Sequence, residues 1–250
     1  MMEQLLANCR DYWLGWGSAE RVDGQLAYYR SGLANGQLNG VLRLGDIDRL
    51  EQSLKDAAER LAGIPWMCWV GPDSAPGTAE RLPGLGGVKL GAMPIMAIDT
   101  KDVVPAEGPA DLEIETVHGL AALKEWVQTY TPSFGVPPEL LDDVLRNELD
   151  RRDTARVVRF IGRRAGRPVG TSLLYEAHGV AGIYVVTTAE DQRRQGIGAA
   201  LTVAALEAGR ERGLPVGTLQ SSPAGFPVYE RLGFETVATY ELFQLAPAHP

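Results

Sequence analysis

The sequence predicts an α/β fold built on a mixed central sheet. Predicted helices alternate with predicted strands, and several neighbouring strands are joined by turns too short to hold a helix. Short turns join antiparallel strands, whereas parallel strands need a longer crossover, so we expect both kinds of pair in one sheet. Apolar residues make up 45% of the 250 residues, which is enough to bury a large core.

The first part of the chain, up to residue 100, mixes helices and strands. Apolar residues at helical spacing predict helices over residues 3–16 and 46–63, and a short helix is expected within 71–86. Strands are expected over 24–31, 40–45, 65–71 and 88–100. Asp46 is the expected N-cap of the second helix, and Pro94 is expected to interrupt the last strand. We expect Tyr28, Trp66 and Trp69 to be core residues.

The segment 99–111 has the composition of a linker, with two prolines, one glycine and four acidic residues. We therefore predict two domains, residues 1–108 and 109–250. In the second domain, strands are expected over 112–117, 155–164, 167–177, 180–188, 217–222 and 234–245. Helices are expected over 120–131, 138–150, 198–212 and 224–233.

Charge argues against nucleic-acid and anionic membrane partners. The chain carries 32 acidic and 24 basic residues, a net charge of −8, and no apolar run approaches the about 18 residues that a membrane helix needs. The arginine-rich stretch 151–167 alternates basic and apolar residues in its strand portion, so we interpret it as the solvated face of a hairpin. Salt-sensitive binding of nucleic acid would contradict that interpretation.

Cysteine and histidine usage predicts a cytoplasmic protein without a metal. Cys9 and Cys68 are too few for a disulfide framework, and the N-terminal stretch lacks the cationic start and apolar core of a signal peptide. The three histidines are scattered and no cysteines are paired, which makes a structural zinc site improbable.

One stretch indicates an anion site. In "EDQRRQGIGAALTVAAL", residues 190–206, Arg193 and Arg194 precede Gly196 and Gly198 at the start of an expected helix, directly after a buried strand. Free N–H groups and the helix dipole favour an anion at such a turn. Leu201 occupies the third glycine position of a dinucleotide fingerprint, and the lysine of a phosphate loop is absent. An ordinary strand-to-helix turn would show the same glycines, so the loop alone leaves both interpretations open.

A second motif, "VYERLGF", follows about 30 residues later with an expected strand between. Together with "RRQGIG" and the strand end "VVTTAEDQ", it makes residues 111–246 resemble the GCN5-related N-acetyltransferase (GNAT) superfamily. Each motif is weak alone, whereas their joint occurrence in this order is specific.

The resemblance implies acetyl-CoA as cosubstrate and a role for each matching residue. The loop would hold the CoA pyrophosphate on the backbone amides of Arg194, Gln195, Gly196, Ile197, Gly198 and Ala199, and Arg193 would start the loop and help to orient it. The preceding strand would hydrogen-bond the pantetheine arm and polarise the thioester carbonyl, through Val186, Thr187 and Thr188. Tyr229 would be the general acid for the departing thiolate, and Ser222 would contact the cofactor.

A general base is not identified by any motif. Glu176 and Tyr184 are candidates by position alone. His178 lies in "EAHGV", which reads as a hairpin turn, and we interpret it as a solvated turn residue.

The first domain lacks both motifs. Its order of elements resembles a degenerate second copy of the same fold, as in two-domain members such as mycothiol synthase-like enzymes, and an unrelated α/β extension is the alternative. The leading hypothesis is therefore an N-acetyltransferase that acts by direct attack of a primary amine, on a small molecule or a protein N-terminus. The alternative is a non-catalytic acyl-CoA sensor. The acceptor, and the choice between monomer and homodimer, stay open.

Overall fold

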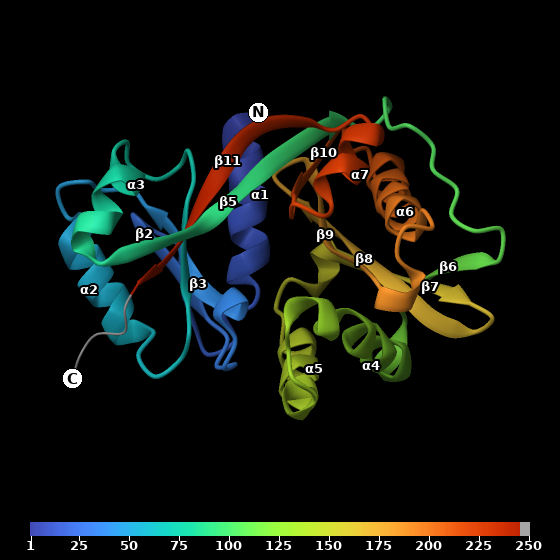
Figure 1. The fold of residues 1–250 in the computed structure, drawn as a ribbon, viewed down its shortest axis with the longest axis horizontal. Helices are drawn as coiled ribbons and strands as arrows, with labels where there is room; N and C mark the ends of the chain where they lie inside the picture. Colours follow the sequence, from blue (N-terminus) through green and yellow to red (C-terminus); the bar gives the residue numbers. More distant parts are fainter. Residues whose placement is uncertain (246–250) are drawn as a thin grey trace. The chain divides into compact units, whose positions relative to one another are not determined.

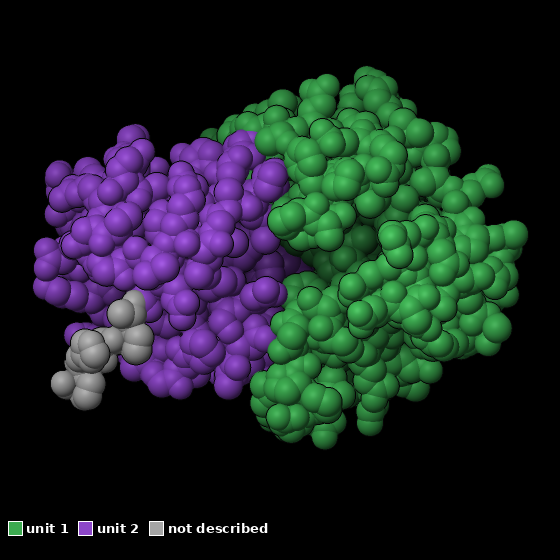
Figure 2. Space-filling model, viewed as in Figure 1, with its two compact units in different colours: residues 1–9, 95–146, 153–237 green, residues 10–94, 147–152, 238–250 purple. Residues whose placement is uncertain are grey.

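The computed structural model describes residues 1–245, and the chain divides into two compact units (Figure 2). Unit 1 comprises residues 1–9, 95–146 and 153–237; unit 2 comprises residues 10–94, 147–152 and the chain from 238 onward. The units therefore interleave along the sequence, and a single boundary between residues 108 and 109 does not describe them. The strand β5 (Gly87–Asp99) shows why, because its residues up to Pro94 belong to unit 2 and those from Ile95 to unit 1.

Unit 2 contains short strands with helices beside them (Figure 1). Its strands run in the order β1 (Glu20–Val22), β2 (Leu26–Arg30), β3 (Asn39–Leu44), β4 (Met67–Val70), the last part of β11 (Glu235–Leu245) and β5 up to Pro94. Its helices are the last turns of α1 (Met2–Leu14), α2 (Leu50–Arg60) and α3 (Thr78–Arg81). β3 and β4 are parallel because α2 connects them, and the pairs β1–β2, β2–β3 and β4–β11 are antiparallel. Apolar side chains from α2, β3 and β4 form its core.

Unit 1 contains the longer strands. Their order is β5, β10 (Val216–Gln220), β9 (Val180–Thr188), β8 (Arg167–Ala177), β7 (Val157–Arg164) and β6 (Leu112–Thr116). β9 and β10 form the one parallel pair among these described strands, because α6 (Ile197–Glu211) crosses between them. α4 (Gly119–Tyr130) and α6 cover opposite faces of β7, β8 and β9 (Figure 1), with α5 (Leu141–Leu149) following α4 and α7 (Phe226–Arg231) following β10. The core under α6 includes Leu174, Ile183 and Leu201.

The sheet is mixed, as the sequence predicts, and the expected strands of the second part occur within one or two residues of their predicted ends. Tyr28, Trp66 and Trp69 are buried. Segment 99–111 is the loop between β5 and β6. No helix of the described chain is long and apolar enough to cross a membrane. Among residues 1–245, the structure also gathers no group of three His, Cys, Asp or Glu side chains that could hold a metal.

Two local predictions are wrong. β5 runs through Pro94 without interruption, because its ladder to β10 begins one residue later, at Ile95, and an extended chain tolerates proline where no N–H is needed. α2 begins at Leu50, since Asp46 Oδ1 accepts the N–H groups of Asp48 (3.0 Å) and Arg49 (3.2 Å) and closes a separate turn before the helix.

The division into units predicts how fragments fold. A chain of residues 109–250 lacks Ile95–Asp99, so β10 loses its antiparallel partner and the unit 1 core loses Met96 and Ile98. We expect this fragment to aggregate or unfold without a cooperative transition, and the chain 95–250 to be measurably more stable. Thermal unfolding followed by circular dichroism compares the two. Equal, cooperative unfolding of both fragments would contradict the division.

Candidate functional site

β9 and β10 are paired over only part of their length and then separate. Their parallel pairing covers Val216–Thr218 against Val180–Gly182 and goes no further among the described residues. From Ile183 to Thr188, β9 stays bonded only to β8, so the backbone groups on its other edge have no strand partner. The surface of unit 1 is hollowed where Figure 1 draws β8 and β9 (Figure 2). An unpaired strand edge inside a sheet is a place where an extended ligand can add hydrogen bonds.

A bulge in β9 lies within this open segment. Leu173 of β8 pairs with Tyr184, and Thr171 pairs with Thr187, so β9 has two residues where β8 has one. Val185 has φ 52°, a left-handed conformation that a β-branched residue adopts only under strain. The buried Thr171 hydroxyl donates to the Val185 carbonyl at 2.7 Å and lies 2.8 Å from Thr187 Oγ1. The Thr187 side chain is thus used within the sheet.

The loop after β9 presents unused N–H groups. Ala200 donates to the Gly196 carbonyl at 3.0 Å, which is the first helical bond of α6. The backbone N–H groups from Arg194 to Ala199 donate no hydrogen bond within the described chain. Arg194 (φ 62°) and Gly196 (φ 84°) are both left-handed, the conformation that turns successive N–H groups toward one concave surface. Six N–H groups and the positive end of a 15-residue helix therefore favour an anion here.

Side chains fix the loop and leave positive charge on it. Arg164 Nη1 donates to Gln192 Oε1 (2.8 Å) and Gln195 Oε1 (2.7 Å), and Arg193 Nε donates to the Thr188 carbonyl at 3.4 Å. Neither the Arg193 nor the Arg194 guanidinium has an ion-pair partner among the described residues, and both are exposed.

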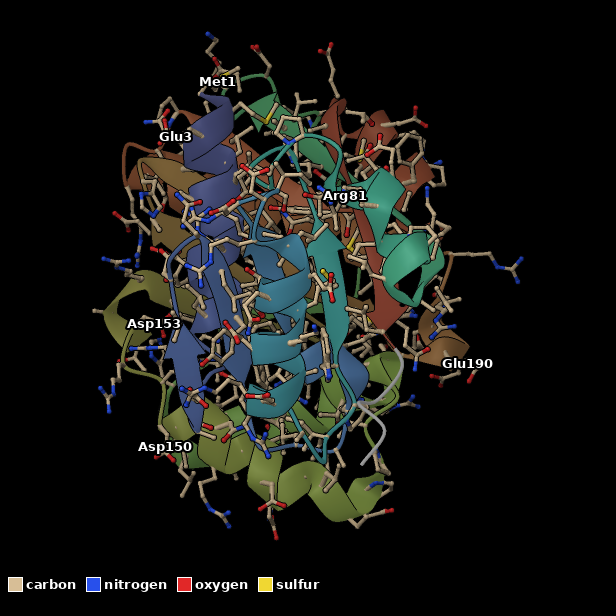
Figure 3. All side chains as sticks on the ribbon, turned by 90° about the vertical axis from the view of Figure 1, so that its left-hand side faces the viewer. Met1, Glu3, Arg81, Asp150, Asp153 and Glu190 are labelled. Carbon is tan, nitrogen blue, oxygen red and sulfur yellow. The ribbon has the colours of Figure 1, made fainter. Side chains whose placement is uncertain are left out.

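Two acids belong to the same loop. Asp191 is paired with Arg167 at 2.7 Å, and this hydrogen bond lowers the pKa of its carboxyl. Glu190 is exposed and lies at the edge of the molecule (Figure 3). The arginines therefore supply the free charge closest in sequence to the unused N–H groups.

Gly198 joins the loop to the open strand. A Cβ at this position would lie 3.5 Å from Thr188 Oγ1 and 3.9 Å from Val186 Cγ1. Both distances are ordinary contacts, and no left-handed φ is present, so the fold itself does not require glycine here. The missing side chain instead keeps the surface open beside Val186 and Thr188, while Ile197 next to it is buried in the core.

Tyr229 and Ser222 lie on either side of Gly225. A Cβ on Gly225 would approach Tyr229 Cε2 to 2.8 Å and Ser222 Oγ to 3.4 Å. The Ser222 hydroxyl accepts the Gly225 N–H at 3.2 Å, which begins the turn into α7. Tyr229 is 8% exposed, its hydroxyl makes no hydrogen bond within the described chain, and burial raises its pKa to about 12. Tyr229 shares one apolar cluster with Val186 of the open strand.

The candidate bases are engaged elsewhere. The Tyr184 hydroxyl donates to Asn8 Oδ1 at 2.8 Å and is buried. Glu176 pairs with Arg212 at 3.2 Å, next to the C-terminal end of α6, whereas the unused N–H groups lie at its N-terminal end. His178 is exposed in the turn between β8 and β9, where the sequence places it. The structure thus brings neither Glu176 nor His178 to the loop.

Four residues that sequence reasoning missed support the site: Asn8, Arg164, Thr171 and Val185. Arg164 and Thr171 belong to correctly predicted strands, but nothing in a strand pattern says which side chain reaches a loop 28 residues away or bonds to a bulge. The left-handed backbone of Val185 has no sequence signal, because valine is the residue least expected to adopt it.

Comparisons with known proteins give a family match for part of the chain and a similar fold. Residues 120–234 match the family model "Acetyltransferase (GNAT) family". A GCN5-related N-acetyltransferase from Kribbella flavida has a similar structure, with a TM-score of 0.75 and 19% identity over 98% of this chain and 96% of that chain. A tandem GNAT protein from the clavulanic acid biosynthesis pathway has a TM-score of 0.62 and 14% identity over 90% of this chain and 79% of its own. At these identities the similarity shows the fold. No curated protein has a sequence that matches this chain.

The burial of Tyr229 predicts that its phenol ionises at a higher pH than an exposed tyrosine does. An exposed tyrosine ionises near pH 10, and burial raises the pKa of Tyr229 to about 12. The ultraviolet titration difference between wild type and Tyr229→Phe should therefore appear near pH 12, provided the protein is still folded. Because the folded protein holds this proton more tightly than the unfolded chain does, the free energy of unfolding falls as the pH rises from about 10 to about 12 and is unaffected by this group below about pH 10. A difference titrating near pH 10 would show that this hydroxyl is solvated.

Proposed function

We propose that this protein is an N-acetyltransferase that uses acetyl-CoA, because residues 120–234 match the model of the acetyltransferase (GNAT) family. The acceptor we propose is a primary amine, on a small molecule or a protein N-terminus. One observation supports this most directly: Gly198 puts the loop with the unused N–H groups beside Val186 and Thr188 of the open strand. That juxtaposition suits a ligand with a phosphate group at one end and an extended amide chain at the other.

The residues fit acetyl-CoA group by group. The N–H groups from Arg194 to Ala199 hold the pyrophosphate, and the Arg193 and Arg194 side chains add positive charge. The open edge of β9 pairs with the amides of the pantetheine arm as a strand would. The bulge at Val185 turns the backbone of β9 out of register with β8, which frees an N–H to polarise the thioester carbonyl.

The chemistry needs one bond formed, one broken and two protons moved. A neutral amine attacks the thioester carbonyl carbon, the new C–N bond forms, and the C–S bond breaks. The nitrogen loses a proton to solvent and the thiolate gains one. Tyr229 donates a hydrogen bond to that thiolate, because its phenol is protonated at neutral pH and its hydroxyl has no competing partner in the described chain.

An acyl-CoA sensor is the second candidate function. The observation that favours it is the engagement of both candidate bases, since Tyr184 bonds to Asn8 and Glu176 to Arg212. A sensor would bind acetyl-CoA at the same loop and transfer nothing. The unpartnered Tyr229 hydroxyl favours the enzyme, because binding alone gives it no role.

We also propose that the protein works in the cytoplasm, without a metal, nucleic acid or membrane partner, as a monomer or homodimer. Its net charge of −8 and the burial of both cysteines support this proposal.

Gly198→Val tests the anion loop. The added side chain projects into the space beside Val186 and Thr188 and keeps phosphate oxygens away from the N–H groups, so we expect CoA affinity to fall by about a hundredfold or more. Isothermal titration calorimetry with CoA measures this fall. Gly84→Val is the matched control, because Gly84 is exposed in unit 2 with open space around it, and it should bind CoA as wild type does. Unchanged affinity in a folded Gly198→Val protein would refute the loop assignment.

Tyr229→Phe separates the enzyme from the sensor. The substitution keeps the ring, which packs against Phe234 at 5.9 Å between centroids, and removes only the hydroxyl. We expect kcat to fall roughly 10²-fold and acetyl-CoA affinity to change less than about threefold, since the hydrogen bond strengthens only as the thiolate forms. Steady-state acetylation of an amine panel and calorimetry provide the two readouts. Equal kcat in both proteins removes Tyr229 from the mechanism. Tight acetyl-CoA binding by wild type with no turnover across the panel supports the sensor.

A further inference from the structure

A buried side-chain amide near the start of the chain is hydrogen-bonded to β9, the strand with the open edge. Asn8 lies in the part of α1 that belongs to unit 1, and its side chain is fully buried. Its Nδ2 donates to three carbonyls of the β8–β9 hairpin, those of Tyr175 (3.2 Å), Ala177 (3.1 Å) and Val180 (3.1 Å). The amide therefore bonds to both strands of the hairpin at the end where β9 is still paired with β10.

The other side of the same amide holds Tyr184. Asn8 Oδ1 accepts the Tyr184 hydroxyl proton at 2.8 Å, and the tyrosine is 6% exposed. Gly182 makes room for this bond, because a Cβ there would clash with Asn8 Oδ1 and with the Tyr184 ring. Gly182 is also the last β9 residue that pairs with β10, opposite Thr218. The bond thus spans the point at which the two strands separate.

Strain at Val185 needs support on both sides. A left-handed, β-branched residue is strained and persists only where its surroundings hold it. Thr171 bonds to the Val185 carbonyl from β8. Tyr184, the residue before Val185, is held by Asn8. β10 no longer pairs with β9 at this point. Asn8 therefore holds a part of β9 that has no neighbouring strand on that edge.

We propose that Asn8 is a positioning residue: through Tyr184 it holds β9 in its separated, bulged path, so that the backbone after Gly182 is presented to acyl-CoA. Its effect on acyl-CoA binding rests on the proposed function, whereas its effect on the shape of β9 does not. Asn8 touches no reacting atom. It restricts the conformations of β9 before the ligand binds, so that less conformational entropy is lost on binding. This is a pre-organisation effect.

The chain offers a matched control. Asn39 in unit 2 is also fully buried, donates to the carbonyls of Leu33 (2.8 Å), Asn35 (2.9 Å) and Pro65 (3.2 Å), and accepts the Ser31 N–H at 2.8 Å. Replacing either asparagine by alanine removes a buried, fully bonded amide. A role that is only structural predicts the same outcome for both.

The experiment compares Asn8→Ala and Asn39→Ala with wild type in the full chain. Amide hydrogen exchange of residues 183–188 is measured without ligand, and acetyl-CoA affinity is measured by calorimetry. We expect Asn8→Ala to speed exchange in this segment and weaken acetyl-CoA binding, each by about tenfold, and Asn39→Ala to change neither beyond about twofold. Tyr184→Phe, which leaves the Asn8 bonds to the hairpin intact, is the second variant should Asn8→Ala fail to fold. It should reproduce both effects, and adding Asn8→Ala to it should change affinity by less than the single substitution does.

The outcomes separate the two proposals. Equal exchange and equal affinity in the Asn8 and Asn39 variants, or a Tyr184→Phe protein identical to wild type, overturns the positioning role. If the wild type binds no acetyl-CoA but Asn8→Ala still speeds the exchange of residues 183–188, the role of Asn8 in holding β9 is supported. The link between that role and acyl-CoA is then overturned, together with the proposed function.

Discussion

The site depends on one constraint: β9 must stay bonded to β8 while it leaves β10. The topology of the crossover then determines where everything else lies. α6 begins just after β9 ends and returns the chain to the start of β10, so its N-terminus lies at the end where the two strands are apart. The topology alone therefore places the unused N–H groups of the loop next to the unpaired edge of β9. Gly198, where a Cβ would contact Val186 and Thr188, marks the point where they meet.

Separating two strands inside a sheet is costly, and the structure offsets the cost with buried side-chain bonds. The open edge of β9 exposes backbone groups that a continuous sheet would satisfy, and Val185 adds strain. Thr171 holds the bulge from β8, and Asn8 holds Tyr184 from α1. In the proposed mechanism the side chains of Thr171, Asn8 and Tyr184 take no part in the reaction. They define the shape of the strand that the proposed chemistry uses.

Much of the fold could be predicted from the sequence, because its signals are local. Apolar runs joined by a short turn predict β8 and β9, and two glycines after a strand predict the loop that begins α6. The placement of Tyr229 and Ser222 near one another follows from the short turn between them. Long-range properties were not predictable. Pro94 was expected to interrupt a strand, yet β5 passes through it, because the ladder to β10 begins only at Ile95. Likewise, Asn8 and Tyr184 are 176 positions apart and carry no shared pattern.

The central claim is that the parted strand and the loop bind a single extended ligand, acetyl-CoA. A crystal structure of the full chain grown with CoA tests it most directly. The account predicts pyrophosphate oxygens within hydrogen-bond distance of several N–H groups between Arg194 and Ala199, and pantetheine amides bonded to the backbone of β9 after Gly182. Well-ordered CoA bound elsewhere, with the strand edge and the loop both empty, would contradict the account.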